Sequence, residues 1–217
     1  MSQPPPLLST LAYERILKAV FESRVPMGGK VSQSDLVKLT GVPVGPVRDA
    51  LKVLEADGLV KINPRSGIEL IKPTTELARV TFQFRAIIEK PAVRNFAMSA
   101  GLDAIDAIRR HHEDAAKIMA ALPPGENVFD QLLEIEDAFH PVMVASLGNE
   151  LVDHSYRRLQ LMTGVIQVKR LVYPAGARVS IEEHLAVLEA CARRDPEAAE
   201  AAISRHLSNA LSRNLGM

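Results

Sequence analysis

The amino-acid sequence predicts a mostly α-helical chain of two domains, one over residues 7–72 and one over residues 76–214. Three observations lead to this fold class. Apolar residues recur at the 3.6-residue spacing of helices along most of the chain. Two short runs typical of β-strands occur together within residues 59–71. Beyond them almost nothing indicates a strand, so the second domain is expected to be an antiparallel all-α bundle of six to seven helices.

Two short helices are expected ahead of the β-type runs. Ser32 is placed to act as the N-cap of the first helix. Gly41 ends it, because glycine adopts the left-handed conformation at little cost. Pro43 and Pro46 begin the second helix, since a proline in the first turn loses no hydrogen bond, and Gly58 ends it. Apolar residues follow helical spacing in both: Leu36, Val37, Leu39, Val47, Ala50, Leu51 and Leu54.

The β-type runs, Leu59–Ile62 and Gly67–Ile71, are joined by a tight loop and form a hairpin. Two helices separated by a tight turn and followed by a two-stranded wing make a winged helix-turn-helix. The second helix of such a module enters the major groove of DNA.

The motifs of this segment resemble the N-terminal domain of GntR-family transcriptional regulators. The resemblance implies a DNA-binding regulator that pairs as a homodimer on a palindromic operator. It rests on Tyr13-Glu14-Arg15-Ile16, Leu39-Thr40-Gly41-Val42-Pro43, Pro46-Val47-Arg48-Asp49-Ala50-Leu51 and Leu54-Glu55-Ala56-Asp57-Gly58-Leu59-Val60.

Cations on the second helix and in the wing are candidate DNA contacts. Arg48 and Lys52 lie one helical turn apart, and Arg65 stands at the tip of the hairpin. Two alternatives stay open. Arg48 pairs with Asp49 or Glu55 instead, and Arg65 is merely solvated.

The chain also departs from the family pattern in this region. Family members usually carry a polar-arginine-threonine trio ahead of the P-V-R motif, where this chain has Pro43-Val44-Gly45. Ser34 replaces an arginine that is frequent in the preceding helix, which leaves Gln33 and Ser34 as the polar candidates for DNA contact there. Because this chain has fewer cations here than family members do, we expect it to bind DNA phosphates more weakly and to recognise different bases.

Composition is ordinary for a globular protein, with 47% hydrophobic and 24% charged residues. Residues 1–72 hold 10 Lys and Arg against 7 Asp and Glu, whereas the rest of the chain holds 16 against 19. A mildly basic N-terminal segment followed by a mildly acidic remainder is typical of a DNA-binding domain joined to a sensor domain. No apolar run is long enough to span a membrane, and no signal-peptide pattern opens the chain. The single cysteine, Cys191, is expected to be buried, and a cytoplasmic location is expected.

The second domain follows a short linker whose Thr74 or Thr75 caps the first helix. Pro91 is expected to kink that helix rather than end it. Ser180-x-x-Glu183 is interpreted as a capping box, and Asp195 as an N-cap before Pro196. Six helices are expected, over residues 75–99, 103–121, 127–147, 149–171, 180–193 and 196–213.

The six histidines divide into two groups. Charged neighbours predict that three are solvated, namely His111, His112 and His154. Apolar spacing places the others on inward faces of three different helices: His140, His184 and His206.

Neutral imidazole and carboxylate are common ligands of divalent transition metals. Glu136 stands one helical turn before His140, and Asp137 is the competing carboxylate. Glu136 or Asp137 with His140, His184 and His206 would make a metal site in the bundle core. The alternative is three core histidines satisfied by hydrogen bonds.

The same segments resemble the C-terminal FCD domain of FadR-type regulators, an effector-binding fold. In metal-binding members the ligands are an aspartate four residues before the first histidine and three histidines. The resemblance therefore implies a metal of the zinc or nickel class, with Glu136 departing from the usual aspartate. It rests on Glu136-Asp137-Ala138-Phe139-His140, Ala145-Ser146-Leu147-Gly148-Asn149-Glu150-Leu151, Glu183-His184, Asp195-Pro196-Glu197-Ala198-Ala199 and Arg205-His206-Leu207.

Arg85 is the candidate effector-binding residue, because the family commonly has an arginine here, near the effector cavity. A guanidinium can bind a small carboxylate through two parallel hydrogen bonds. An ion pair with Glu89, one turn further on, explains Arg85 equally well.

The expected function is a homodimeric regulator whose operator affinity responds to a small organic acid, bound beside a divalent metal. The first alternative is a metal-dependent hydrolase or lyase built on the histidine-rich domain. Against it, the sequence lacks an H-E-x-x-H motif, a nucleophile elbow and a catalytic cysteine context. The second alternative is a regulator without metal that senses its effector through cavity shape alone.

Overall fold

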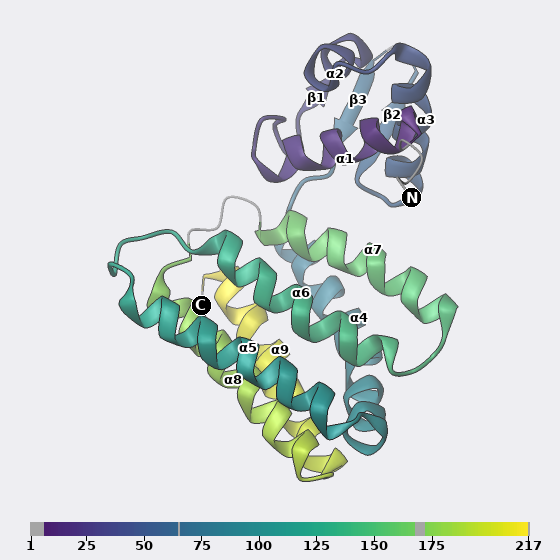
Figure 1. The fold of residues 1–217 in the computed structure, drawn as a ribbon. Coiled ribbons are helices and arrows are strands. Elements are labelled where there is room, and N and C mark those ends of the chain that lie inside the picture. The colour runs from purple at the N-terminus through teal and green to yellow at the C-terminus, as the bar shows by residue number, and fades with distance from the viewer. Residues whose placement is uncertain (1–6, 65, 168–171, 217) are drawn as a thin grey trace, which may run out of the picture. The chain divides into compact units, whose positions relative to one another are not determined.

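The computed structural model describes residues 7–64, 66–167 and 172–216, which form nine helices and three strands (Figure 1). These residues divide into two compact units. The first contains the residues up to Leu77 and the segment that begins at Leu161. The second contains residues 78–160 and the described residues from Val172 onward. The fold class is confirmed as a winged helix-turn-helix and an all-helical bundle.

The first unit is built from three helices and a small antiparallel sheet. Ser32 caps its second helix by accepting from the amide of Asp35, whose carboxylate in turn accepts from the Ser32 amide. Gly41 ends that helix with a φ of 65°, as predicted. The elements are α1 (Leu8–Phe21), β1 (Lys30–Val31), α2 (Gln33–Thr40), α3 (Val44–Ala56), β2 (Val60–Asn63) and β3 (Gly67–Leu70).

The sheet has three strands rather than the two that the sequence predicted. β3 pairs with β2 in the wing hairpin and with β1 on its other edge. β1 covers only Lys30 and Val31, which is too short to show an alternating pattern. Gly67 faces β1 closely, since an added Cβ would lie 3.0 Å from the Val31 carbonyl oxygen. Its φ of 92° also favours glycine.

One apolar core joins the helices of the first unit to the sheet. Its fully buried members come from every helix and from β3, which fixes α3 against α1 and α2. They include Ala12, Ile16, Leu36, Val47, Ala50, Leu51, Leu54 and Ile68. Burial of these faces leaves the opposite face of α3 to solvent.

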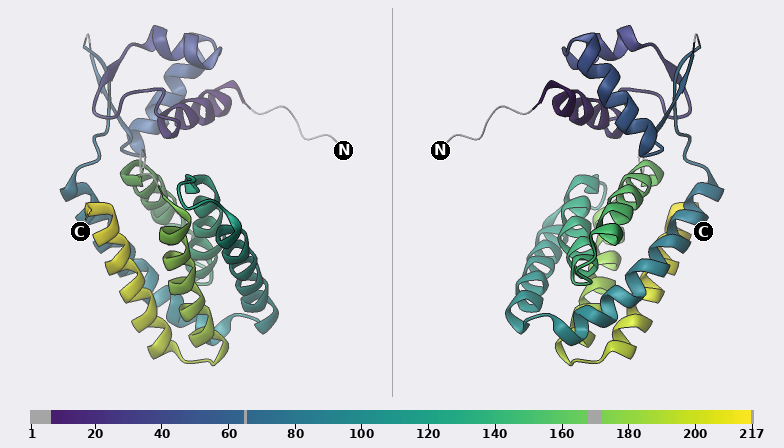
Figure 2. Two further views of the ribbon diagram at one scale, coloured as in Figure 1. Left: turned by 90° about the vertical axis from the view of Figure 1, so that its left-hand side faces the viewer. Right: turned by 90° about the vertical axis from the view of Figure 1, so that its right-hand side faces the viewer.

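The second unit is a helical bundle, in which α8 and α9 form an antiparallel hairpin and α5 packs along α8 (Figure 2). Its apolar core draws on α4, α6, α8 and α9, with Phe96, Phe139, Leu188 and Ile203 among the buried residues. The remaining helices are α4 (Thr75–Ser99), α5 (Leu102–Ala121), α6 (Phe129–Ala145), α7 (Glu150–Gln167), α8 (Pro174–Ala192) and α9 (Pro196–Leu215). The first residues of α4, up to Leu77, and those of α7 from Leu161 belong to the first unit.

Helix starts in the second unit agree with the sequence at two points and differ at a third. Thr74 accepts from the amide of Leu77, and Asp195 caps α9 by accepting from the amide of Ala198. The interpretation of Ser180 as an N-cap is wrong, because α8 already begins at Pro174. This proline occupies the first turn of the helix, where it loses no hydrogen bond. Ser180 lies buried inside α8 and accepts a hydrogen bond from Arg213.

The remaining expectations concern Pro91, Cys191 and membrane spans. α4 continues through Pro91. Cys191 is buried as predicted, and burial raises the pKa of its thiol to about 11. A helix was expected over 149–171, and the last residues of that range lie outside the described residues. Among the described residues, α7 ends at Gln167. Among the described residues, no helix combines the length and the apolar character that a membrane crossing requires.

Candidate metal centre and DNA-binding surface

Four predicted ligands come together inside the second unit. Glu136 and His140 lie on α6, His184 on α8 and His206 on α9, and one ligand atom from each lies within 4.8 Å of the others. The three imidazoles are buried and Glu136 is half-buried. Asp137, the competing carboxylate, is exposed and stands outside the cluster.

Helical spacing and hairpin packing explain how the cluster forms. Glu136 and His140 are four residues apart, so Oε2 of Glu136 lies 3.1 Å from Nε2 of His140. α8 and α9 pack side by side and bring Nε2 of His184 to 3.3 Å from Nε2 of His206. Oε1 of Glu136 lies 3.7 Å from Nε2 of His184. All three imidazoles therefore direct Nε2 toward the same point.

Carboxylates hold the outer nitrogens of two of these histidines. Nδ1 of His140 lies 2.8 Å from Oε2 of Glu89, and Nδ1 of His206 lies 2.8 Å from Oε2 of Glu183. An ionised carboxylate only accepts hydrogen bonds, so each Nδ1 carries a proton and donates it. In the neutral ring Nε2 then presents a lone pair to the cluster. Among the described residues, Nε2 of His140 makes no hydrogen bond of normal geometry, although Oε2 of Glu136 lies 3.1 Å from it.

The third histidine uses another imidazole in place of a carboxylate. Nδ1 of His184 lies 3.1 Å from Nε2 of His112 on α5. The ring of Phe139 stacks on His184, with centroids 4.0 Å apart and planes inclined by 16°. Burial lowers the pKa of His184 well below its ordinary value, and the charge of His206 adds to the shift. Both effects favour the neutral ring that binds metals.

Charge in the cluster is concentrated on Glu136 and His140. Burial raises the pKa of Glu136, but contact with His140 outweighs burial and holds it well below its usual value. Burial lowers the pKa of His140, yet the Glu89 carboxylate outweighs that effect and the pKa lies above its ordinary value. The site therefore attracts one positive charge, which a proton or a metal ion can supply.

A second buried network surrounds Glu89. Nε of Arg85 donates to Oε1 of Glu89 at 2.6 Å, and the Tyr156 hydroxyl donates to the same oxygen at 2.9 Å. Arg85 is 3% exposed, so the ion pair offered as an alternative for this residue exists and is buried. Burial raises the pKa of Glu89, but Arg85 and then His140 outweigh it and lower the pKa to about 2. Glu89 thus links the arginine to the histidine cluster through His140.

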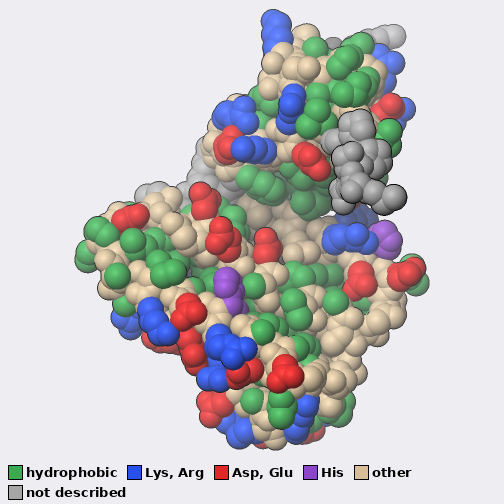
Figure 3. Space-filling model, viewed as in Figure 1, with side chains coloured by type: hydrophobic (Ala, Val, Ile, Leu, Met, Phe, Trp, Pro, Cys, Tyr) green, Lys and Arg blue, Asp and Glu red, His purple; other side chains and the backbone are tan. Residues whose placement is uncertain are grey.

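His112 contradicts the expectation that it is solvated, because it is 0% exposed. Its charged neighbours misled the prediction, whereas its spacing did not. Ile105, His112 and Met119 repeat every seven residues and are the buried residues of α5. His111 and His154 are exposed as predicted. Figure 3 shows acidic and basic side chains side by side over α5, where Arg109 pairs with Asp106 and Glu113.

Functional residues that sequence reasoning missed thus form the outer layer of the site. Glu89, His112 and Glu183 each contact a predicted residue through a side chain, and Tyr156 contacts Glu89. Glu89 was expected only as a possible partner of Arg85, His112 carried its signal in the seven-residue spacing of α5, and the signal of Glu183 was taken for helix capping. The other contacts join residues 51 or more positions apart, with the exception of the Arg85 pair with Glu89.

The exposed face of α3 carries the predicted DNA contacts. Arg48 and Lys52 are both exposed, and Lys52 forms an exposed ion pair with Asp49 at 3.1 Å. Glu55, a suggested partner of Arg48, accepts from the backbone amide of Ile62 at 2.7 Å. The suggested carboxylate partners of Arg48 are therefore engaged elsewhere.

The polar residues of α2 contact the turn and the helix cap. Nε2 of Gln33 donates to the carbonyl oxygen of Val44 at 3.3 Å, which joins the start of α2 to the start of α3. The Ser34 hydroxyl lies 2.7 Å from that of Ser32. Arg65, the predicted wing contact, lies outside the described residues.

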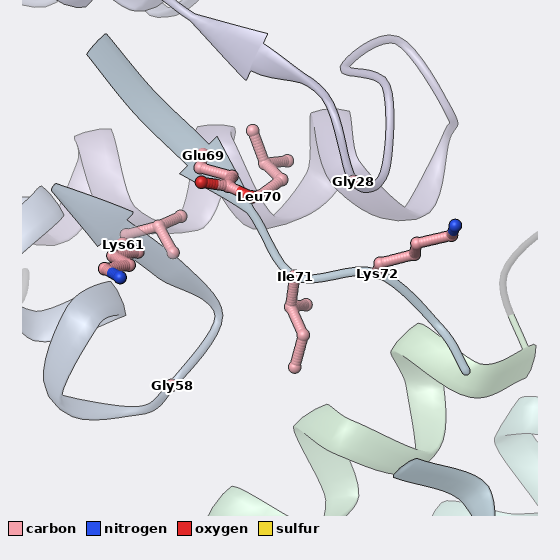
Figure 4. Close-up of a pocket in the computed structure, with 8 residues that line it drawn as sticks. Gly28, Gly58, Lys61, Glu69, Leu70, Ile71 and Lys72 are labelled. Carbon is pink, nitrogen blue, oxygen red and sulfur yellow. The ribbon is translucent and has the colours of Figure 1, made fainter. Parts of the chain in front are cut away.

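A pocket of about 250 Å³ lies in the first unit, where β2 begins and β3 ends (Figure 4). None of its lining residues belongs to the histidine cluster, and its charged groups are of both signs. The lining comprises Gly28, Gly58, Val60, Lys61, Glu69, Leu70, Ile71 and Lys72. Its chemistry gives no preference for the small acid that the sequence led us to expect.

Comparison with known proteins agrees with both halves of the fold. Residues 8–70 match the family model described as bacterial regulatory proteins, gntR family, and residues 80–209 match the FCD domain. A winged helix-turn-helix joined to such a helical domain defines a DNA-binding transcriptional regulator rather than an enzyme. The chain belongs to the GntR family, in the group that carries an FCD domain.

Individual relatives are distant but match over nearly the whole chain. The uncharacterized HTH-type transcriptional regulator YdhC of Bacillus subtilis (strain 168) is 23% identical over 91% of this chain and 86% of its own. The structure of E. coli McbR/YncC has a TM-score of 0.80 at 14% identity, covering 98% of this chain and 99% of its own. The Zn²⁺-bound FCD domain of TM0439 has a TM-score of 0.53 at 20% identity, covering 65% of this chain and 94% of its own.

Proposed function

We propose that this regulator binds a divalent transition metal of the zinc or nickel class in its helical unit, and that a small carboxylate bound beside the ion changes its affinity for operator DNA. The single observation that supports this most is the convergence of the Nε2 atoms of His140, His184 and His206 on the Glu136 carboxylate. The protein acts in the cytoplasm, where bacterial operators lie.

The distances in the cluster suit a metal ion. Two ligands of a tetrahedral zinc ion with bonds of about 2.0–2.1 Å lie about 3.3–3.4 Å apart. Nε2 of His184 and Nε2 of His206 are 3.3 Å apart, and Nε2 of His140 lies 3.1 Å from Glu136. Three lone pairs and a carboxylate at such distances repel one another unless a cation lies among them. The name of the Zn²⁺-bound FCD domain of TM0439 supports zinc as the first metal to test.

The charges around the site favour an anionic ligand. Glu89 is paired with Arg85, and Glu183 is paired with Arg213 at 2.8 Å. Glu136 differs from these two carboxylates. In the ion pairs of the described residues, its partners are histidines and not an arginine or a lysine. A bound divalent ion therefore leaves a net charge of about +1, which a carboxylate neutralises. The metal ion attracts one carboxylate oxygen of the acid, and we propose that the guanidinium of Arg85 also binds the acid's carboxylate.

A homodimer accounts for an apolar stripe on α4. Val80, Phe84, Ile87 and Met98 are between 40% and 63% exposed on the outer side of this helix. The first three follow the i, i+4, i+7 spacing of a helix seam. A second copy of the chain is the proposed occupant, because a palindromic operator requires two helix-turn-helix units. Sedimentation of Ile87→Glu should show monomer, whereas Ile118→Glu, at a similarly exposed site on α5, should stay dimeric.

The decisive experiment measures metal content and DNA binding together. Full-length protein from cells grown with zinc and nickel is analysed for metal by mass spectrometry. Its affinity for a duplex selected from a random-sequence library is then measured with a panel of small mono- and dicarboxylic acids. We expect about one ion per chain and a 5–150-fold change in DNA affinity with at least one acid. His154→Ala, which alters an exposed histidine, should retain the metal, and His184→Ala should lose it.

Two outcomes would contradict the proposal. Protein that contains no zinc or nickel under these conditions has hydrogen-bonded core histidines instead of a metal site. If metal is present and none of the acids shifts DNA affinity, the metal is structural and the carboxylate effector is wrong.

A further inference from the structure

The fourth buried histidine, His112, has both ring nitrogens engaged. Its Nδ1 lies 2.8 Å from the carbonyl oxygen of Ile108, one turn earlier on α5. A carbonyl oxygen only accepts, so Nδ1 of His112 carries the proton. Its Nε2 is therefore an acceptor, directed at Nδ1 of His184 at 3.1 Å.

The orientation of His184 follows from this chain of hydrogen bonds. Nδ1 of His184 must donate to His112, so the lone pair of His184 is on Nε2. That atom lies 3.3 Å from Nε2 of His206 and 3.7 Å from Glu136. The stack with Phe139 fixes the plane of the ring, but it does not determine which nitrogen bears the proton. The contact of Nδ1 with His112 does so, because Nε2 of His206 has its own lone pair directed at Nε2 of His184.

We propose that His112 is a positioning residue for the metal centre: it holds His184 in the tautomer and rotation that present Nε2 to the ion. This inference rests on the metal site proposed above. In His140 and His206 the same task falls to the carboxylates of Glu89 and Glu183. α5 thus takes part in metal binding although it supplies no ligand.

An imidazole acceptor has a different electrostatic effect from a carboxylate. Each carboxylate in the outer layer has an arginine beside it, Arg85 for Glu89 and Arg213 for Glu183. His112 accepts through Nε2 as a neutral ring, since its proton is on Nδ1, and it needs no such cation. Nδ1 of His184 is consequently held without added charge in the most buried part of the cluster.

Two variants of His112 separate positioning from packing. His112→Leu fills the space but offers no acceptor, whereas His112→Gln keeps a carbonyl oxygen that can accept from His184. His111→Ala is the matched control, because His111 is the adjacent residue on α5 and is exposed. Zn²⁺ affinity of the full-length protein is measured by competition with a chromophoric chelator. The tautomer of His184 is read from its imidazole ¹⁵N shifts in metal-free protein.

We expect His112→Leu to weaken Zn²⁺ binding by about 10–100-fold and to remove the Nδ1–H tautomer signal of His184. His112→Gln should recover most of the affinity, and His111→Ala should match the parent. A His112→Leu protein with parental Zn²⁺ affinity overturns the inference, as does equal loss in the Leu and Gln variants, which would indicate packing alone.

Failure of the proposed function gives a different result. A parent protein that binds no Zn²⁺ removes the metal site, whatever His112 does. The tautomer measurement then still tests the contact itself: His184 must carry its proton on Nδ1 in the parent and lose that preference in His112→Leu. Absence of this change refutes the positioning role.

Discussion

Replacing Arg85 with methionine removes the guanidinium that neutralises a fully buried carboxylate. The side chains of Arg85 and Glu89 are 4% and 0% exposed, and Nε of Arg85 lies 2.6 Å from Oε1 of Glu89. Breaking one side of such a pair costs about 3–5 kcal/mol, because the remaining charge stays desolvated. Tyr156 and His140 still contact Glu89, so we expect a value near the lower limit, about 3 kcal/mol.

Urea unfolding of metal-free protein, followed by far-ultraviolet circular dichroism, measures this loss. For a chain of this size it corresponds to a fall in Tm of about 6–12 °C. The double variant Arg85→Met with Glu89→Gln removes both charges but keeps an oxygen that accepts from Tyr156. It should be markedly more stable than Arg85→Met alone. The reasoning fails if Arg85→Met unfolds within about 1 kcal/mol of the parent, or if the double variant is no more stable than the single one.

The other predictions concern DNA binding, metal removal and alkaline pH. Arg48→Ala should weaken binding to the selected duplex by about 1–3 kcal/mol in fluorescence anisotropy at fixed salt, and Lys117→Ala, a cation on α5, should not. Chelator should lower the Tm of the parent and leave His184→Ala unchanged; equal sensitivity of the two proteins would contradict a metal role for His184. Burial, with the hydrogen bond to Asp57, raises the pKa of Tyr13 to about 12. The stability that this contact contributes is therefore complete below about pH 10 and is lost as pH rises toward 12. Urea midpoints of the parent and Tyr13→Phe should converge over that range, and a constant difference would contradict the shift.

Local chemistry explains why much of the fold was predictable. Ser32, Gly41 and Asp195 act at helix ends through contacts within three or four residues, and each has the role that the sequence predicted. Ser180 shows the limit of the same reasoning. The residues around Ser180 match the capping pattern, but α8 begins earlier, at Pro174. The Ser180 hydroxyl accepts a hydrogen bond from Arg213 of α9 instead. A contact between helices thus overrides a local pattern.

The convergence of Glu136, His140, His184 and His206 was predictable for a similar reason, and the side chains that surround these four residues were not. Glu136 and His140 are joined by helical spacing, and the apolar faces around His184 and His206 point them inward. His112 reaches His184 across 72 positions of sequence, and only the packing of α5 on α8 brings them together. The spacing of each residue along its own helix indicates burial, but it does not reveal which residue of another helix it contacts.

Tyr156 gives the regulator an intrinsic optical probe of its own interior. The chain contains no tryptophan and three tyrosines, so tyrosine dominates its near-ultraviolet absorbance and emission. The Tyr156 hydroxyl donates to one oxygen of Glu89, and the other oxygen of Glu89 accepts from His140. Any change in the charge of that imidazole alters the acceptor strength of the carboxylate and therefore the excited state of the phenol. A difference spectrum against the Tyr156→Phe variant isolates this signal and allows titrations of the buried cluster without an added label.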